Sequence, residues 1–347
     1  MYKNNKIKIA IIGSGWFGCH IGLKLKEKNF NIKIFEKGND IFFNSSGNNT
    51  NRLHLGFHYP RSIKTRDMSY KGYKRFVKEY PKLSTKIKEN IYAIADDNLN
   101  KISPKSFTRS MIKSKLKLNE YSVSQTDLKN VLKTFNTSER QIDHIKAKKF
   151  FLNNLKKNLY LNCEIKKITK INKKFKLNNE LFDYVVNCTS QQSFKLNKLK
   201  LTYEHCVISL YKSKKRNHKS YTIMDGPYYT LLKWNKDIFG LYSVKFSRLM
   251  SSKNFQKVKK SYLNFKHKNQ KTIQNNLVKD FLKFYPNFKN NFKFIKNLHS
   301  IRTINTNKND ARLSLVKNKN NFINVMSGKI DHIFYASDQV LKCIKIY

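Results

Sequence analysis

Three glycines near the N-terminus are spaced so that a phosphate-rich ligand can lie against the backbone. The segment reads Gly13-Ser14-Gly15-Trp16-Phe17-Gly18, a complete GxGxxG pattern. In this pattern the first glycine allows a tight turn, the second lets the backbone approach a pyrophosphate, and the third lets a helix pack closely on a strand. Amide donors and the positive end of the helix dipole then bind the phosphates. The spacing therefore predicts dinucleotide binding.

An acidic residue completes this pattern. Glu36 follows Gly18 by 18 residues, and a carboxylate at that place accepts hydrogen bonds from both ribose hydroxyls. It would also repel a 2′-phosphate, which disfavours NADP. The glycines and the acid do not by themselves separate FAD from NAD.

The glycine turn needs a strand before it and a helix behind it. Residues 6–12 are short and β-branched, as in a buried parallel strand. Residues 16–28 place apolar side chains on one helical face, and residues 31–36 form a second strand that ends at the acid. This order of elements confirms the context that the pattern requires.

The rest of the chain mixes helices and strands. Helices are expected over 66–80, 127–134, 143–158 and 256–284, and strands over 91–96, 163–171, 174–177, 184–188, 322–326 and 333–335. Alternating runs between 201 and 247 suit an antiparallel sheet. The predicted fold class is α/β (α+β overall), a Rossmann-like FAD/NAD(P)-binding domain interrupted by an antiparallel-sheet substrate domain. We expect the first domain to comprise 1–90, 141–200 and 290–347, and the second 91–140 and 201–289.

Two further segments carry a family resemblance. Residues 182–189 (FDYVVNCT) resemble the strand and turn that read D-x-V-V-x-A-T-G in FAD-binding oxidoreductases, with Ser190 in place of the usual glycine. Residues 51–62 (NRLHLGFHYPRS), preceded by small polar residues, look like the segment that runs beside the flavin in the D-amino-acid oxidase and glycine oxidase-like (DAO) superfamily. Weaker likenesses at 225–231, 302–312 and 327–330 extend the resemblance over nearly the whole chain.

The resemblance implies FAD held without a covalent bond, and hydride removal from a C–N or C–O bond of a small amine, amino acid or hydroxy compound. The residues expected to bind the cofactor are Gly13, Gly15, Trp16, Phe17, Gly18, Glu36, Lys37, Ser46, Asn51, Arg52, Leu53, Thr189, Gly328, Lys329 and Ile330. Of these, Lys329 would stabilise the negative charge of the reduced flavin, or else lie on the surface.

Three residues are expected to act on the substrate. His58, like the nearby His54, has a pKa suited to proton transfer, although either can instead be a structural histidine. Arg61 would meet a substrate carboxylate or form a structural ion pair. Arg302 lies where an arginine of the family often meets the substrate carboxylate.

Charge and composition leave other functions open. The net charge is +49, from 71 basic and 22 acidic residues among 347. The excess is mostly lysine and spread along the chain, as coding bias produces, whereas a nucleic-acid binder more often enriches arginine. We therefore expect no specific nucleic-acid partner. Two alternatives remain open, a flavin-dependent enzyme without net redox turnover, such as a sugar mutase, and a polyanion-binding protein with a vestigial nucleotide fold.

Cysteines and hydropathy bear on the compartment. The five cysteines are scattered, with no CxxC pair and no histidine at metal-ligand spacing. No metal site is therefore expected, and a reducing compartment fits. Because no apolar run approaches the length of a signal peptide or a membrane span, the expected location is cytoplasmic. The sequence does not indicate an oligomeric state.

Overall fold

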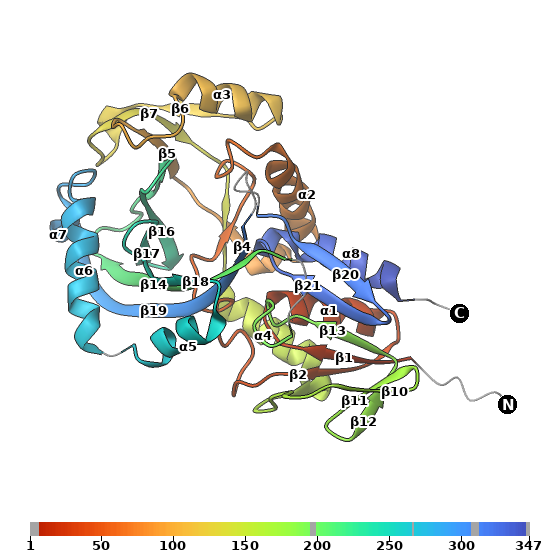
Figure 1. The fold of residues 1–347 in the computed structure, drawn as a ribbon. Coiled ribbons are helices and arrows are strands. Elements are labelled where there is room, and N and C mark those ends of the chain that lie inside the picture. The colour runs from red at the N-terminus through yellow and green to blue at the C-terminus, as the bar shows by residue number, and fades with distance from the viewer. Residues whose placement is uncertain (1–6, 195–198, 266, 307–311, 345–347) are drawn as a thin grey trace.

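The computed structural model describes residues 7–194, 199–265, 267–306 and 312–344. It contains two large sheets, which Figure 1 shows on opposite sides of the molecule. Asp310 and Ala311, which belong to one of the resembling segments, lie outside the described residues.

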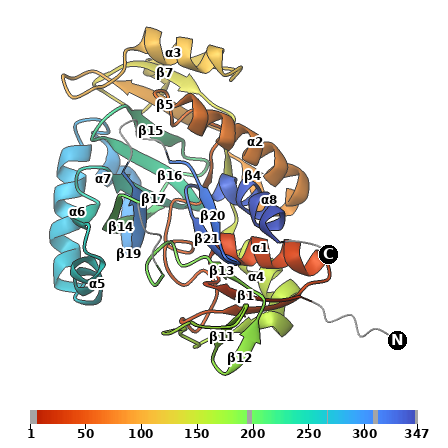
Figure 2. The ribbon, with the colours of Figure 1, turned by 45° about the vertical axis from the view of Figure 1, so that its right-hand side comes forward.

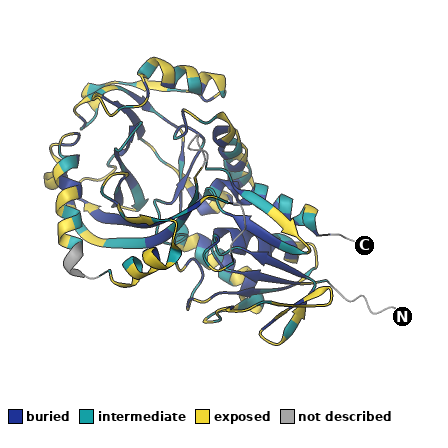
Figure 3. Ribbon diagram, in the orientation of Figure 1, coloured by how far each residue is buried: buried dark blue, intermediate teal, exposed yellow. Residues whose placement is uncertain are grey.

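The smaller of these sheets carries the glycine turn. Its six strands run in the order β20 (Leu315–Lys319), β21 (Phe322–Met326), β13 (Tyr184–Asn187), β1 (Lys8–Ile12), β2 (Asn31–Phe35) and β9 (Leu159–Tyr160). Neighbours are parallel except β20 and β21. Residues 9–12 of β1 are buried, as parallel strands covered on both faces must be. Figure 3 shows this sheet as a mostly buried layer.

Different layers cover the two faces of this sheet. Helices α1 (Trp16–Glu27), α4 (His144–Leu155) and α8 (Ile333–Cys343) share a core with Ile9 and Ile11 of β1. The opposite face, with Ala10 and Ile12, packs on a small antiparallel sheet of β10 (Thr169–Ile171), β11 (Lys174–Leu177) and β12 (Glu180–Phe182). The turn after β1 is therefore held between packed layers.

The larger sheet has nine strands. Its path runs β18, β14, β17, β16, β15, β5, β7, β6, with β19 also paired to β14. Neighbours are antiparallel except β5 and β15. The bounds are Arg248–Ser252 (β18), Leu201–Ser213 (β14), Ile238–Ser243 (β17), Tyr229–Asn235 (β16), Ser220–Met224 (β15), Asn90–Ala95 (β5), Val131–Asn136 (β7), Asn119–Tyr121 (β6) and Phe292–Asn305 (β19). The antiparallel sheet expected over 201–247 is thus confirmed.

Further helices cover the larger sheet. Residues of α6 (His267–Phe281) and α7 (Phe288–Asn291) share its core, and α3 (Pro104–Lys113) packs against β5 and β7. Helix α5 (Phe255–Leu263) packs beside β14 through Val258. Figure 2 shows α3 at the far end from the termini, with α5 and α6 along one side.

A second small sheet and one long helix lie between the large sheets. The sheet joins β3 (Arg52–Leu53), β8 (Arg140–Ile142) and β4 (Ser84–Lys86), and the helix is α2 (Ile63–Glu79). The segment 51–62 therefore runs between the two halves of the molecule. Short 3-10 turns span Pro81–Leu83, Val123–Gln125, Lys156–Asn158 and Ile330–His332.

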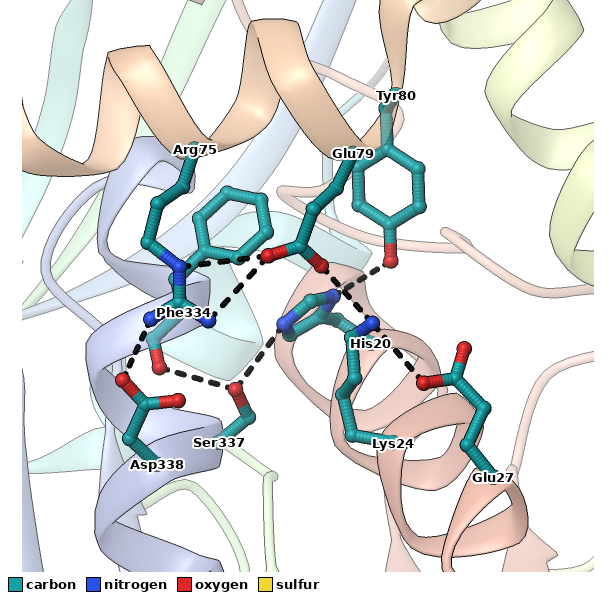
Figure 4. A network of polar contacts seen from close by, with 9 residues as sticks. All are labelled: His20, Lys24, Glu27, Arg75, Glu79, Tyr80, Phe334, Ser337 and Asp338. Carbon is teal, nitrogen blue, oxygen red and sulfur yellow. Dashed lines mark hydrogen bonds and ion pairs between the residues drawn. The ribbon is translucent and has the colours of Figure 1, made fainter.

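A buried polar network fixes the helix behind the glycine turn (Figure 4). His20 of α1 has its Nδ1 2.7 Å from the Tyr80 hydroxyl and its Nε2 3.1 Å from the Ser337 hydroxyl of α8. Burial lowers the pKa of His20 well below its usual value, so the imidazole is neutral at pH 7. Lys24, one turn further along, pairs with Glu79 of α2 at 2.8 Å. These contacts hold α1, α2 and α8 in one arrangement.

Two expected elements were wrong, and the strand expected over 163–171 is confined to Thr169–Ile171, which is β10. Residues 127–134 are not a helix: 131–136 form β7, because Val131 and Thr134 belong to a run that pairs with β5. Residues 333–335 begin α8 and are not a strand, because Ile333, Phe334 and Val340 bury one helical face. Helix α3 and strand β19 were not predicted. The domain bounds stay a proposal; β19, within 290–347, joins the larger sheet.

Candidate functional site

The glycine turn is closed by backbone contacts. Gly13 has φ +96°, and its amide donates to the Phe35 carbonyl of β2 at 2.8 Å. A Cβ on Gly18 would lie 1.9 Å from the Gly13 carbonyl oxygen, a distance that no side chain can occupy. A Cβ on Gly15 would instead meet the Ser46 hydroxyl at 2.7 Å. Gly18 therefore serves packing, while Gly15 leaves open the space beside the helix N-terminus.

A groove of about 100 Å³, which we call the nucleotide groove, lies beside this turn. Three strand ends of the six-stranded sheet meet here, which is where ligands bind in open α/β sheets. The predicted residues that line it are Gly13, Gly15, Glu36, Lys37, Ser46 and Thr189.

Glu36 lies at the end of this groove. One carboxylate oxygen accepts from the Ser14 amide at 2.8 Å and the Ser14 hydroxyl at 2.9 Å. The other accepts from the Gly38 amide at 2.9 Å. A carboxylate offers about four acceptor positions, so Glu36 both fixes the turn and keeps capacity for a ribose hydroxyl.

A larger space, which we call the main cavity, has a volume of about 420 Å³. It lies between the glycine turn, the segment 45–59, the larger sheet and the residues around 328. The nucleotide groove and the main cavity share Gly15, Ser45, Ser46, Cys188 and Ser190 on their walls. The two spaces are therefore continuous and suit one elongated ligand.

These walls fit FAD. Helix α1 has Gly15 as its N-cap residue, and Gly15, Trp16 and Phe17 line the main cavity, so the N-terminus of the helix lies at the junction of the two spaces. The Trp16 amide donates to the Ser46 hydroxyl at 3.1 Å. The nucleotide groove matches the ADP half of FAD, because its wall contains the acid and the glycines. The main cavity leaves room for a ring system, since its volume lies within the roughly 300–1,000 Å³ that is usual for ligand pockets. Two residues of its wall carry buried polar atoms that find no hydrogen-bond partner among the described residues, the Arg52 Nη2 and the Tyr59 hydroxyl.

Most predicted residues line one of these spaces. Those on the wall of the main cavity are Gly15, Trp16, Phe17, Ser46, Arg52, His58, Arg302, Gly328, Lys329 and Ile330. Gly18, Asn51, Leu53 and Arg61 line neither space. Asn51 contacts His144 at 3.2 Å, and Leu53 is buried in the core beneath α1. Whether any of these residues binds cofactor or substrate stays a prediction.

Arg61 lies in a different environment from the one that its expected role requires. Its side chain is 41% exposed, and its Nε donates to Asp225 at 2.6 Å. Asp225 itself lines the main cavity. The structural ion pair, the alternative left open for Arg61, is thus present.

A buried carboxylate that the sequence did not reveal organises the floor of the main cavity. Glu139 is fully buried and accepts from the Leu55 amide at 3.0 Å and the Tyr92 hydroxyl at 2.8 Å. Arg52 and His54 each lie 3.5 Å from its oxygens. Burial raises the pKa of Glu139, but the hydrogen bond and charge of His54 and the charge of Arg52 outweigh it, and the pKa falls to about 2.

His54 and His58 present two imidazoles to the same wall. Their ring centroids lie 5.3 Å apart, and both line the main cavity. Burial lowers the pKa of His58 well below its usual value, and the charges of His54 and Lys329 lower it further. His58 is therefore neutral at pH 7. The Nδ1 of His54 lies 3.5 Å from Glu139, a contact that can orient the imidazole.

Another part of the main cavity's wall is basic. Arg302, Arg312 and Lys329 line it. Arg302 donates through Nε to Glu204 at 2.6 Å. Burial lowers the pKa of Lys329 to about 8, with Arg312 as the next contribution. Glu204, like Glu139, was not anticipated, because no motif surrounds either acid and each meets its arginine only in the folded chain.

Two negative findings concern the described residues. No helix among them is long and apolar enough to cross a membrane. No cluster of three His, Cys, Asp or Glu side chains in the same part of the chain is placed to hold a metal ion.

Comparison with protein families and curated proteins gives a consistent result. Residues 8–291 match the model of the DAO family, described as FAD dependent oxidoreductase. A relative from Fusarium mangiferae, the FAD-dependent monooxygenase FPY4, is 30% identical over 342 residues, covering 98% of this chain and 92% of its own.

Solved structures share the fold. L-α-glycerophosphate oxidase from Mycoplasma pneumoniae superposes with a TM-score of 0.77 at 13% identity, covering 97% of this chain and 94% of its own. Glycine oxidase from Geobacillus kaustophilus gives 0.69 at 12% identity, over 97% and 93%. At these identities the likeness is one of architecture, and it agrees with the α/β fold class expected from the sequence.

Proposed function

This chain belongs to the DAO family of FAD-dependent oxidoreductases, and from that premise we propose that it oxidises a C–H bond next to an amine or hydroxyl of a small substrate. Bound FAD supplies the two-electron acceptor for such a reaction. Bound FAD would accept the hydride from the substrate carbon, so this chain has to provide a base for the N–H or O–H proton. The product is an imine or a carbonyl compound.

The observation that carries this proposal is the His54–Glu139 contact on the cavity floor. The Nδ1 of His54 lies 3.5 Å from Glu139, within ion-pair distance, although it makes no hydrogen bond among the described residues. A proton held on Nδ1 would leave Nε2 with a free lone pair. In that tautomer His54 is the base that accepts the substrate proton. The buried carboxylate then stabilises the imidazolium that forms, as an acid behind a catalytic histidine does in other enzymes.

The remaining residues position and shield the reacting groups. Tyr92 and the Leu55 amide occupy lone pairs of Glu139, which fixes its plane. The neutral His58 and the aromatic ring of Tyr59 lie beside His54, at 5.3 and 5.8 Å between ring centroids. This wall limits the access of water to the base and strengthens its electrostatic contact with Glu139.

An anaerobic reduction experiment tests the proposal. The purified protein, loaded with FAD, is mixed with a panel of amines, amino acids and hydroxy acids, and the visible flavin absorbance is followed. Loss of that absorbance without any added reductant is expected for the true substrate class. If no compound reduces the flavin, and turnover requires prior reduction by dithionite, the redox proposal is wrong.

Monooxygenation is the second candidate, because the relative FPY4, which matches 98% of this chain, is named a monooxygenase. The two outcomes differ in the fate of oxygen. A monooxygenase places one atom of O₂ in its product, whereas a simple oxidase or dehydrogenase does not. Mass spectrometry of the product formed under ¹⁸O₂ separates them.

A further inference from the structure

Lys329 brings a primary amine to the wall of the main cavity. The residue is half-buried and lies in the turn between β21 and α8. Its ammonium lies over the ring of Tyr59, 5.3 Å from the ring centre. Among the described residues, this ammonium has no hydrogen-bond or ion-pair partner. The Nζ is therefore available to a ligand in the cavity.

The surroundings of Lys329 favour the uncharged amine. Burial lowers its pKa to about 8, and the charges of Arg312 and Arg302 act in the same direction, whereas the carboxylates of Asp331 and Glu139 oppose them. Roughly a tenth of the Lys329 side chains therefore carry an uncharged amine at pH 7. Desolvation and a neighbouring cation are two ways in which proteins turn a lysine into a nucleophile that attacks carbonyl groups.

Two neighbours on the same wall can move protons. The Tyr59 hydroxyl is buried and finds no hydrogen-bond partner within the part of the chain described. Burial raises its pKa well above the usual value, so it stays protonated and can donate. Burial, and then the charges of His54 and Lys329, lower the pKa of His58, so its imidazole is neutral and can accept a proton. A donor and an acceptor thus accompany the amine.

From this arrangement we infer that Lys329 is a nucleophile that forms an imine with the carbonyl product of the oxidation. The inference rests on the proposed function, which supplies the carbonyl compound, and adds a covalent step after the redox step. It uses Lys329 for a reaction at the substrate carbon, which is a different role from stabilising the charge of a reduced flavin.

The atoms of this step balance without an oxidant or a reductant. As Nζ bonds to the carbonyl carbon, it gives one proton to His58, and the carbonyl oxygen takes one from Tyr59. The C–O bond then breaks, and the oxygen leaves as water with the proton from His58. The remaining N–H proton returns to Tyr59, which leaves a C=N bond between product and protein. Water reverses the step and releases the product.

Reductive trapping tests the inference. The FAD-loaded protein is incubated at pH 7 with sodium cyanoborohydride and a small ketone, which the cavity of about 420 Å³ can hold. The probes are pyruvate, the kind of product that an amino or hydroxy acid gives, and hydroxyacetone, the kind that a polyol gives. Cyanoborohydride converts an imine into a stable secondary amine, and peptide mass spectrometry identifies each modified lysine. The probe that reacts faster identifies the class of product.

Lys74 is the matched internal control. It lies over the ring of Tyr70, 4.3 Å from the ring centre, but it is exposed and lies outside the cavity wall. We expect Lys329 to be modified on the order of tenfold faster than Lys74, because more of its amine is uncharged. The rate at Lys329 should also rise as the pH increases through 8, since the uncharged amine attacks.

Variants locate the chemistry. Lys329→Arg keeps the positive charge but cannot form an imine, so the adduct at this position should disappear. Tyr59→Phe should slow trapping at Lys329 about 100-fold, the lower range for proton transfer by a positioned side chain. Lys74→Arg should leave trapping at Lys329 unchanged. Flavin content reports whether each variant has folded, and the comparison of the two lysines in the unmodified protein needs no variant.

Two results would overturn the inference. One is equal modification of Lys329 and Lys74 by both ketones, and the other is a rate at Lys329 that does not rise between pH 7 and 9. The oxidase proposal fails separately, when no substrate reduces the flavin. A protein that is trapped at Lys329 but not reduced by any substrate keeps the nucleophile and loses the oxidase function, and the converse result keeps only the oxidase.

Discussion

Oε1 of Glu139 lies 3.5 Å from Nδ1 of His54, and neither residue is near the other in sequence. Strands β3 and β8 bring them together, because Arg52 pairs with Gln141 and Leu53 with Arg140 in antiparallel register. The two residues next to this short ladder are therefore placed by backbone hydrogen bonds. The contact on the cavity floor is as rigid as that ladder.

Replacement of His54 tests the proposed base. His54→Gln is expected to slow reduction of the flavin by substrate about 100-fold, the lower range for general-base catalysis, while flavin content stays normal. Stopped-flow absorbance measures the rate. His299→Gln, a half-buried histidine outside the cavity, is the control; an equal loss in both variants would remove His54 from the mechanism.

The Glu139 carboxylate is expected to stabilise the fold in a pH-dependent way. Its folded pKa of about 2 lies below the ordinary 4.5, so its contribution is complete above pH 4.5 and is lost as the pH falls toward 2. Glu139→Gln should lose roughly 3 kcal/mol at pH 7, since it leaves Arg52 without its buried counter-charge. Urea unfolding of both proteins should give curves that converge below pH 4.5. A gap that stays constant with pH would contradict the assignment.

Lys329 predicts an alkaline limb in substrate binding. Its pKa of about 8 means that the ammonium loses its charge as the pH rises through 8, so an anionic substrate should then bind more weakly. The charged groups that act on it are Arg312, Asp331, Arg302 and Glu139. The pH profile of kcat/KM should therefore fall above 8, and Lys329→Met should lack this fall. A fall that persists in the variant would assign it to another group.

Replacing Gly15 or Gly18 of the turn is expected to impair different properties, flavin binding in one case and stability in the other. Gly18→Ala forces a Cβ against the Gly13 carbonyl at 1.9 Å and should lower the melting temperature of the protein even without FAD. Gly15→Ala meets only the end of the Ser46 side chain, so the protein should fold but retain little flavin, because the methyl group occupies the approach to the pyrophosphate. Thermal unfolding and flavin-to-protein ratio separate the two. Equal melting temperatures would contradict this division of roles.

The sequence was sufficient where local pattern and local structure coincide. The glycine turn, β1, β2 and the acid at the end of β2 could be read directly, because each depends on residues within 36 positions of the N-terminus. It was insufficient for β19, where lysine and asparagine side chains interrupt the apolar alternation of Phe292–Asn305 and pairing with β14 makes the strand. High lysine content thus hides strand periodicity.

The floor and the basic end of the cavity could not be predicted for a related reason. No motif surrounds Glu139 or Glu204 in the sequence. They form part of the cavity's surroundings only because the chain around β8 and β14 places them beside Arg52 and Arg302. Arg61 pairs with Asp225, one of the two alternatives that the sequence left open for it, and the segment alone could not show which partner it would meet. Partners separated by long stretches of chain carry no local signal.

The order of strands in the six-stranded sheet has a consequence for biosynthesis. Strand β13 lies between β1 and β21, and helix α8 packs on α1 through residues that are translated more than 300 positions later. Until the ribosome has released that late segment, helix α1 behind the glycine turn lacks its covering helix α8, and strand β13 lacks its neighbour β21, although β1 already has β2 and β13 beside it. Flavin insertion should therefore be a post-translational event, and a nascent chain stalled before residue 315 should emerge without flavin and depend on chaperones.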